Sequence, residues 1–436
     1  MSPGEGLATA EGRREPMQLA NRARTGHLVS VALFGGFFLL YFALGSILAT
    51  LDAVYDYFGA DMWVDLDPNA EYRHMLVPIF VEPVVRVVRR LFASVPAQAA
   101  ALNAAFGALA VALAFQVFLR VVRSSREATL LALLYGVSMS QMLFSSVPET
   151  YAIGASGIVA TYLVFLVSLA TGRLRFLPWF GVALWTVGIT TSNVAQTAVA
   201  YVAAARRAPG QRRVLRGALL GVAVLASVIL FLRIQPGIVG SRPLLSLEAL
   251  QTEYIDIVSN VVPPPDPEDE GPPDPPLSEG RSVRLLATNY LLLGFVGGVP
   301  GRSPLDDHRT KLEYFGHPLR FTPLGLVAAV LWIVLWLAGV RANLRAARAR
   351  DAWPPRTFLG ATGLIVAGNL LLFTIYNPIE MYLYSLLTTF PILLLGVNGE
   401  MLRKPRWAAA LAVLVVLMGL NNFDIIGTML DCGACQ

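Results

Sequence analysis

Cysteine, histidine and charged residues are all scarce in this sequence of 436 residues. It has 2 cysteines and 4 histidines, and charged residues make up 14% of it, whereas about 25% is usual for a soluble protein. Cys432 and Cys435 lie close together at the C-terminus, so they cannot hold a disulfide framework, and the sequence does not say whether they pair. The motifs HExxH and GxSxG and a Walker-type glycine loop are absent, which leaves hydrolase, zinc-site and nucleotide-driven pump functions without support.

Apolar residues are abundant instead, at 55% of the chain. A membrane-spanning helix needs about 17 to 25 mostly apolar residues. Stretches of that length lie near 28–51, 97–119, 127–147, 151–171, 214–233, 322–340, 357–376, 379–398 and 407–422. The first is too long for the core of a secretory signal and is interpreted as a retained span. In a membrane protein, the positive charges are interpreted by the side of the membrane on which they lie. The net charge of +5 therefore does not indicate a nucleic acid, and the expected partner is a lipid bilayer.

The apolar stretch 176–205 is longer than one span and has basic clusters on both sides, "GRLR" before it and "RRAPGQRR" after it. Because cytoplasmic loops collect Lys and Arg, both clusters are expected on one side. Two short helices that break near "TTSN" (Thr190 to Asn193) satisfy this rule. The sequence therefore predicts an all-α polytopic membrane protein of about eleven transmembrane helices.

The distribution of charge orients this layout in a cell inner (plasma) membrane. Segments assigned to the inside hold most of the Lys and Arg residues, which predicts a cytoplasmic N-terminus and an extracytoplasmic C-terminus. The expected parts are a tail (1–27), a membrane module (28–233) with an acidic outer loop (52–96), a second outer loop (234–321) with a Pro- and acid-rich linker (261–276), and a second membrane module with a short outer tail (322–436). The Gly-rich run 288–301 is expected to be re-entrant or interfacial.

The first outer loop gathers carboxylates beside aromatic residues. Asp52, Asp56 and Asp61 flank the first span, and a carboxylate that is partly desolvated at the membrane boundary binds a proton more readily, which suits a base. Asp65 and Asp67 have the DxD spacing of ligands for a hard divalent cation, although an acid-rich loop produces this pattern often.

A basic amphipathic helix is predicted over "EPVVRVVRR" (82–90). Arg86, Arg89 and Arg90 fall on one face and valines on the rest. Two ligands fit such a helix. One is anionic lipid headgroups, and the other is the phosphate of a substrate, which the planar guanidinium binds well.

Two predicted spans begin with a Glu and Tyr pair on the outer side. Glu149 and Tyr151 start the span at 151–171, and Glu380 and Tyr382 start the span at 379–398. Each glutamate also has a structural explanation. For Glu149 it is a capping box with Ser146, and for Glu380 it is a favourable position in a first helical turn. Two such pairs on one side favour a shared polar cavity.

This layout resembles the GT-C class of membrane glycosyltransferases, which use polyprenyl-phosphate-linked sugars. In the branch with dolichyl-phosphate-mannose and aminoarabinose transferases, the first loop carries an aspartate, often in "DE", and later a "KPPL"-like or "HPL"-like element. Here "FGAD" supplies Asp61 and "YRHMLVP" supplies Arg73 and His74, while Met62 replaces the second acid and Met75 replaces a usual proline. The chain is also similar to poorly characterised bacterial multi-pass proteins with "FGAD", "PHPLF"-like and "VPETF"-like segments.

The GT-C resemblance implies a hexosyl or pentosyl transfer with inversion to an extracytoplasmic acceptor, a glycan, lipid or protein, in the cell envelope. It implies Asp61 as the base, with Asp56 second, and arginines for the leaving phosphate. The residues expected to bind substrate are Arg73, His74, Arg86, Arg89, Glu149, Tyr151, Glu380 and Tyr382. No cofactor is certain from the sequence, and the one candidate is a divalent cation at Asp65 and Asp67. The alternative is a multi-pass transporter or flippase of lipid-linked or small polar substrates.

Overall fold

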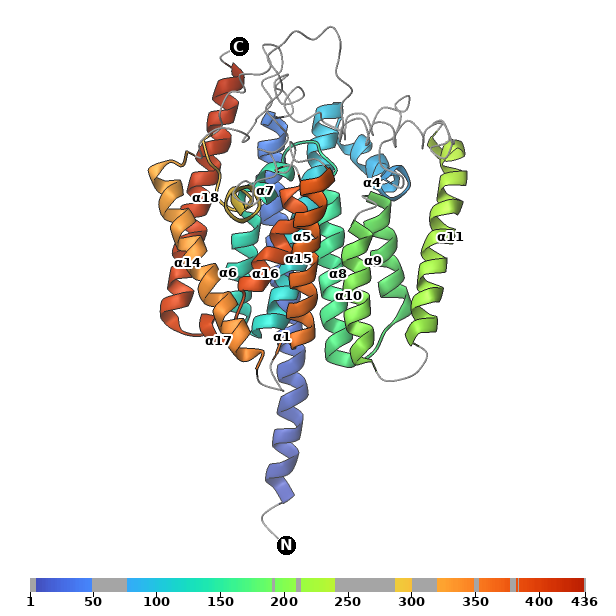
Figure 1. The fold of residues 1–436 in the computed structure, drawn as a ribbon, viewed down its shortest axis with the longest axis vertical. Helices are drawn as coiled ribbons and strands as arrows, with labels where there is room; N and C mark the ends of the chain where they lie inside the picture. The colour runs from blue at the N-terminus through green and yellow to red at the C-terminus, as the bar shows by residue number, and fades with distance from the viewer. Residues whose placement is uncertain are drawn as a thin grey trace.

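The computed structural model describes residues 5–48, 77–189, 193–208, 213–239, 287–299, 320–348, 353–376, 382 and 384–434. These residues form helices and their connections and contain no strand, which confirms the all-α class (Figure 1). Six segments within them are long and apolar enough to cross a membrane: Gly26–Leu48, Val95–Val122, Tyr151–Thr171, Val214–Phe231, Pro323–Ala346 and Pro405–Thr428. Shorter apolar helices cover Phe176–Ile189, Arg356–Leu372 and Ser385–Gly396. The protein is therefore membrane-embedded, and the count of eleven spans stays a prediction.

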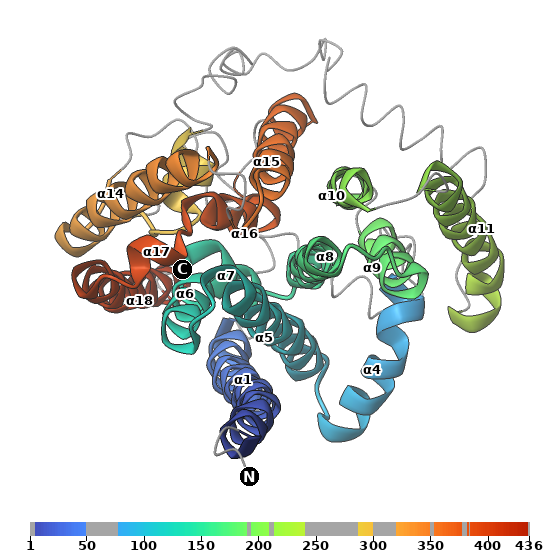
Figure 2. The same cartoon turned by 90° about the horizontal axis from the view of Figure 1, so that it is seen from below.

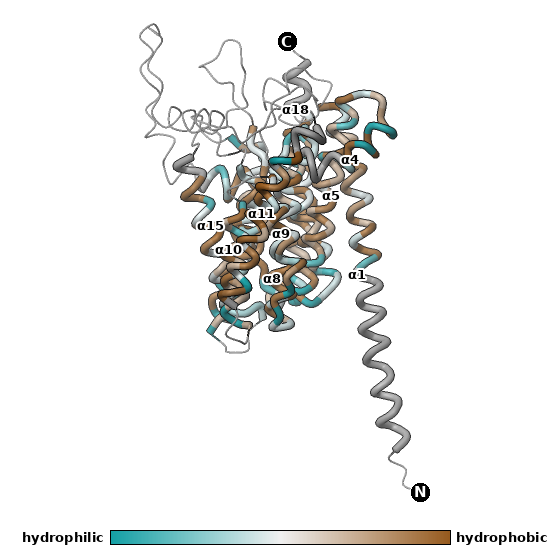
Figure 3. Tube along the Cα trace, turned by 90° about the vertical axis from the view of Figure 1, so that its right-hand side faces the viewer, coloured by the Kyte–Doolittle hydropathy of each residue, from teal (hydrophilic) through white to brown (hydrophobic). Residues whose placement is uncertain are grey.

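The helices are arranged as a bundle around α5 (Val95–Val122) and α8 (Tyr151–Thr171) (Figures 1 and 2). In the most apolar window of α8, 72% of the residues are buried, against 11% for α11 (Arg213–Val239) at the periphery. Around them lie α1 (Glu5–Leu48), α14 (Pro323–Ala346), α15 (Arg356–Tyr376), α16 (Ser385–Gly396) and α18 (Pro405–Ala434), with the short α17 (Gly399–Leu402). The tube in Figure 3 is largely hydrophobic between the two ends of the bundle, as expected for a bilayer environment.

Local sequence signals set several helix boundaries. Ser94 caps the start of α5 by accepting from the Ala97 N–H, and Thr322 caps α14 by accepting from the Gly325 N–H at 2.9 Å. Each of these helices has a proline in its first turn, where no N–H partner is lost. At the other end of α8, Gly172 takes a φ of 65°, a left-handed conformation that ends the helix.

Arginines gather at one end of the bundle, called here the lower end, where α5, α8, α10 and α14 finish. The opposite end, where α8 begins, is the upper end (Figure 1). At the lower end the Arg207 Nε donates to the Thr357 Oγ1 at 3.1 Å, and the Arg123 guanidinium lies 5.3 Å from the centre of the Trp353 ring. The other basic residues at this end include Arg120, Arg173, Arg206, Arg341, Arg345, Arg403, Lys404 and Arg406. The basic segments that the sequence assigns to one side thus share one end.

The stretch 176–205 forms two helices, as the sequence predicts: α9 (Phe176–Ile189) and α10 (Val194–Arg207). The Trp179 ring packs on Tyr201 with centroids 5.2 Å apart, and the Thr186 and Thr197 hydroxyls lie 3.0 Å apart. Early residues of α9 therefore pair with late residues of α10, so the two helices run antiparallel. This arrangement brings both flanking basic clusters to the lower end.

The sequence predicts one span over 127–147, and the structure has two helices there, α6 (Ser125–Gly136) and α7 (Met139–Phe144). A second irregular element, η2 (Ala287–Leu293), lies beside this break, in the run that the sequence predicts to be re-entrant or interfacial. The Met139 and Ser140 N–H groups donate to the Phe295 and Gly294 carbonyls, at 2.9 and 3.0 Å.

Two asparagines of α18 complete the hydrogen bonding of these irregular segments. Asn422 accepts from the Gly297 N–H at 2.7 Å and donates to the Val137 and Phe295 carbonyls at 2.8 and 2.7 Å. Asn421 donates to the Gly297 carbonyl at 2.9 Å. Irregular backbone is tolerated at membrane depth only where protein satisfies its polar groups. The α6–α7 break and the segment that follows η2 both obtain such partners from α18.

Candidate functional site

Four rings form an aromatic cluster at the upper end of the bundle: Phe144, Tyr151, Tyr382 and Tyr384. The centre of the Phe144 ring lies 5.4 Å from Tyr151 and 5.6 Å from Tyr382, and Tyr151 meets Tyr384 edge-on at 5.9 Å. Phe144 ends α7, Tyr151 begins α8, and the other two precede α16. The structure therefore brings the two predicted tyrosines Tyr151 and Tyr382 to one place, joined by a phenylalanine that sequence reasoning did not select.

Glu149 lies in the short connection between α7 and α8, next to this cluster in the chain, and is 2% exposed. The capping box expected for it with Ser146 is wrong. The residue that precedes α8 is Thr150, and the Ser146 hydroxyl donates instead to the Met142 carbonyl, at 2.8 Å. Ser146 continues the hydrogen bonding of α7 and is not free to start the next helix. The position of Glu149 is thus not explained by capping.

Tyr290 of η2 adds a further phenol beside the aromatic cluster, and it is 1% exposed. Tyr290 is a close neighbour of Tyr384. Its hydroxyl can donate and accept hydrogen bonds. Sequence reasoning missed this residue, because its only signal was the unusual Gly-rich apolar run that contains it.

The predicted arginine helix is α4 (Val77–Leu91), which lies at the edge of the upper end of the bundle, beside α5 and α11 and roughly perpendicular to the long helices (Figures 1 and 2). Its Val85 is 4% exposed and packs in a small core with Phe106 of α5, Ile153 of α8 and Ile189 of α9, among others. Arg86 and Arg89 lie on the exposed face of the same helix. The packing of Val85 therefore fixes the arginine helix to the upper end of the bundle, the end at which α8 begins.

The remaining predicted site residues lie outside the described part of the chain. They are Asp56, Asp61, Asp65, Asp67, Arg73, His74 and Glu380. Helix α16 begins at Ser385, later in the chain than the span start expected at 379. Within the residues that are described, no group of three or more His, Cys, Asp or Glu side chains could hold a metal ion.

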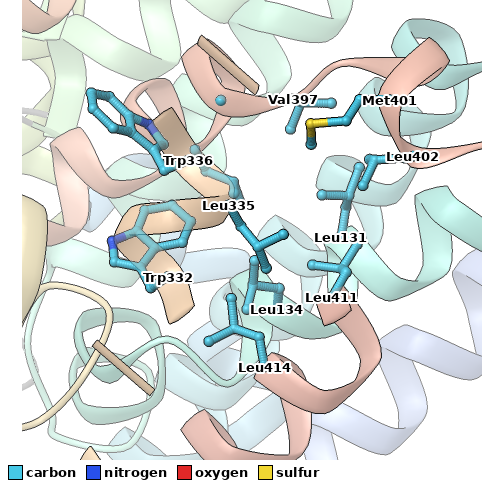
Figure 4. Close-up of a pocket in the computed structure, with 12 residues that line it drawn as sticks. Leu131, Leu134, Trp332, Leu335, Trp336, Val397, Met401, Leu402, Leu411 and Leu414 are labelled. Carbon is cyan, nitrogen blue, oxygen red and sulfur yellow. The ribbon is translucent and has the colours of Figure 1, made fainter. Parts of the chain in front are cut away.

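A small crevice of about 30 Å³ lies away from this site, between α6, α14, α16, α17 and α18 (Figure 4). Leu131, Leu414 and Met401 line it together with two tryptophans. The Trp332 and Trp336 indole N–H groups both donate to backbone carbonyls, of Leu291 and Ile392. The crevice wall is therefore almost wholly hydrocarbon, and it offers no group for catalysis.

Neither a scan against protein-family models nor a search of curated proteins returns a match for this chain. The site is therefore interpreted from its own chemistry. It combines a buried carboxylate, four aromatic rings and an arginine-bearing helix at one end of a membrane bundle.

Proposed function

We propose that this protein is a membrane glycosyltransferase that transfers a hexose or pentose, with inversion, from a polyprenyl-phosphate carrier to an extracytoplasmic acceptor. The observation that carries the proposal is the buried Glu149 carboxylate, next in the chain to an aromatic cluster and at the same end of the bundle as the arginine helix α4. Aromatic rings offer rigid, amphipathic contact area for a sugar, and guanidinium groups bind phosphate. The upper end of the bundle therefore offers groups for both parts of a lipid-linked sugar phosphate, with rings for the sugar and arginines for the phosphate.

In the proposed reaction, a carboxylate of the first loop acts as the base, with Asp61 the first candidate and Asp56 the second. It takes the proton of the acceptor hydroxyl as the acceptor oxygen forms a bond to the anomeric carbon of the sugar. The bond from that carbon to the phosphate oxygen breaks on the opposite face, and the polyprenyl phosphate leaves with the electron pair. Arg86 and Arg89 of α4, with Arg73, would stabilise the charge that develops on this phosphate.

The remaining roles follow from position. Glu149, Tyr151 and Tyr382, with Glu380 and His74, would hold the sugar or the acceptor, and Asp65 and Asp67 would bind a divalent cation if one is needed. The proposed location is the cell inner membrane, with the basic lower end and the N-terminus in the cytoplasm and the C-terminus outside. Acceptors of three classes, glycan, lipid and protein, are compatible with this orientation.

The test is a donor-cleavage assay in membranes with a panel of radiolabelled polyprenyl-phosphate hexoses and pentoses, in which release of polyprenyl phosphate is measured. Asp61→Asn removes the base and should lower the rate by about 10² to 10⁴-fold. Glu149→Gln should lower it by at least about tenfold, because it removes a charge from the site. The matched control is Glu400→Gln, an exposed glutamate at the lower end, which should leave the rate unchanged.

Two outcomes would contradict the proposal. If the wild-type protein cleaves none of the donors, the glycosyltransferase function fails. If Asp61→Asn and Asp56→Asn both retain the wild-type rate at equal expression, the first-loop base is wrong.

A transporter or flippase is the second candidate, and the two irregular elements favour it. Discontinuous helices such as α6 and α7, with η2 beside them, often line substrate sites in secondary transporters. The two functions differ in bond chemistry. A transporter moves the labelled lipid-linked sugar across a liposome membrane without releasing polyprenyl phosphate, whereas the transferase releases it.

A further inference from the structure

Two buried amide side chains meet where α9 gives way to α10. Asn193 is 1% exposed and Gln196 is 3% exposed, and the Gln196 Nε2 donates to the Asn193 Oδ1 at 3.3 Å. The other half of each amide, the Asn193 Nδ2 and the Gln196 Oε1, has no hydrogen-bond partner among the described residues. Buried polar atoms in native proteins are nearly always paired, so an unpaired donor beside an unpaired acceptor indicates a place where another molecule completes the hydrogen bonds.

The amide pair lies directly beneath the aromatic cluster. A Cβ placed on Gly154 of α8 would come within 3.4 Å of the Asn193 Nδ2 and within 3.2 Å of the Leu387 Cδ2 of α16. Gly154 follows Tyr151 by one helical turn, and Leu387 follows Tyr384 by about one turn. Asn193 therefore faces the first turns of the same two helices that present the tyrosines.

The surroundings hold the amide pair in a fixed position. The Thr197 hydroxyl, next to Gln196 in the chain, lies 3.0 Å from the Thr186 hydroxyl of α9 and 3.2 Å from the Thr161 hydroxyl of α8. All three threonines are buried. These contacts tie α9 and α10 to α8, so a ligand would meet preorganised hydrogen-bonding groups.

The chemistry of the pair selects an uncharged ligand. A hydroxyl group accepts one hydrogen bond and donates another, so it matches a free amide N–H and a free amide oxygen. An anion would be repelled by the Gln196 Oε1, and a cation would be repelled by the Asn193 N–H. The amide pair carries no charge that could neutralise either ion. We propose that Asn193 and Gln196 form a hydroxyl-recognition subsite that binds the sugar below the aromatic cluster. This inference rests on the proposed function only in identifying the ligand with the transferred sugar.

The experiment measures sugar binding without any transfer. The full chain, purified in a detergent that has no sugar headgroup, is melted in the presence of increasing glucose, mannose, galactose or arabinose. At least one of these sugars should raise the Tm of the wild-type protein. Gln196→Met keeps the size and flexibility of the side chain but removes its amide, both the free Oε1 acceptor and the Nε2 donor to Asn193, and it should weaken that binding by about tenfold.

The stability of the sugar-free variant separates a binding role from a structural one. Gln196→Met removes the unpaired Oε1, which favours stability, and also the Nε2 that donates to the Asn193 Oδ1, which opposes it. Its Tm without sugar should therefore stay close to that of the wild type. The matched control is Gln116→Met in α5. The Gln116 amide donates to the Ser30 Oγ at 2.7 Å and accepts from the Arg120 guanidinium at 2.9 Å, so this variant should lose stability and keep its sugar affinity.

A second variant tests the position of the subsite. Gly154→Ala puts a methyl group 3.4 Å from the Asn193 Nδ2, where the sugar hydroxyl would lie, and should abolish the sugar-dependent rise in Tm. If no sugar stabilises the wild-type protein, the amide pair binds water only and the inference is overturned. Unchanged sugar affinity in both Gln196→Met and Gly154→Ala overturns it as well.

Failure of this inference and failure of the proposed function give different results. If the wild type cleaves a donor and Gln196→Met does so with the same KM and kcat, the function stands and the subsite is wrong. If no donor is cleaved, but a sugar stabilises the wild type and not Gln196→Met, the subsite stands and the transferase function is wrong.

Discussion

At the residue scale, Asn422 joins two irregular segments that lie far apart in the sequence. It forms hydrogen bonds with three backbone groups, of Val137, Phe295 and Gly297, on two separate irregular segments. Asn422→Leu keeps the volume and leaves those three groups without this partner. The Phe295 carbonyl keeps the Met139 N–H as a donor, so two groups, of Val137 and Gly297, bear the loss. An unsatisfied buried polar group costs about 1 to 3 kcal/mol, so the variant should lose about 2 kcal/mol or more of stability.

The measurement is the thermal unfolding of purified protein, followed by helical circular dichroism. Asp424→Asn, at an exposed position of the same helix, is the control and should melt like the wild type. Equal melting of Asn422→Leu and the wild type would mean that neighbouring groups replace the asparagine.

The candidate site was predictable at this scale only where polar residues stand at the edges of apolar stretches. Glu149, Tyr151 and Tyr382 could be selected in this way, because a carboxylate or a tyrosine at the start of a span contrasts with the residues that follow. Asn193 and Gln196 could not. Amides inside apolar helices form many ordinary packing contacts, and only the structure shows that these two have unpaired atoms.

At the scale of elements, close helix contacts depend on glycine. In α14, a Cβ on Gly339 would lie only 1.7 Å from the Gly396 carbonyl oxygen of α16. Gly339→Ala must therefore push the two helices apart, and overpacking of this kind typically costs about 1 to 3 kcal/mol. The expected result is a lower Tm in detergent.

Gly363 of α15 supplies the control for this change, because a Cβ there meets nothing within 4 Å. Gly363→Ala should leave the Tm unchanged or raise it slightly, since alanine favours helix more than glycine does. A normal Tm for Gly339→Ala would show that α14 and α16 can separate without loss.

The sequence predicts elements well where charge or length constrains them. The division of 176–205 into α9 and α10 followed from the basic residues on both sides, which one span would have separated. The break between α6 and α7 had no such signal. Residues 137–140 are apolar enough to continue a helix, and Asn422, which accommodates the break, is 285 positions away from Val137.

At the scale of the whole molecule, charge separates the two ends of the bundle. The described arginines of α5, α10, α14 and α17–α18 connections gather at the lower end, so the positive-inside rule favours that end in the cytoplasm. The grouping of arginines at one end could be predicted from the sequence, because it depends on the composition of the loops. The composition can be counted without knowing how the helices pack. The positions of the helices around α5 and α8 needed the structure.

The orientation can be measured with single cysteines in a chain whose Cys432 and Cys435 are changed to serine. Ala208→Cys marks the connection after α10, and Glu268→Cys marks the Pro- and acid-rich linker. A membrane-impermeant maleimide on intact cells should label position 268, and it should label position 208 only after the membrane is opened. Labelling of position 208 on intact cells would reverse the proposed topology and remove the extracytoplasmic site.

The two asparagines of α18 also constrain the order in which the protein can be assembled. A chain is synthesised from its N-terminus, and the carbonyl of Val137 obtains its Asn422 partner only after 285 further residues have been made. Until the last helix is inserted, the α6–α7 break and the η2 segment must be kept from lipid by water, by other segments or by the insertion machinery. A chain that ends before Asn421 would therefore be nearly complete, but the α6–α7 break and the η2 segment would lack their hydrogen-bond partners from α18.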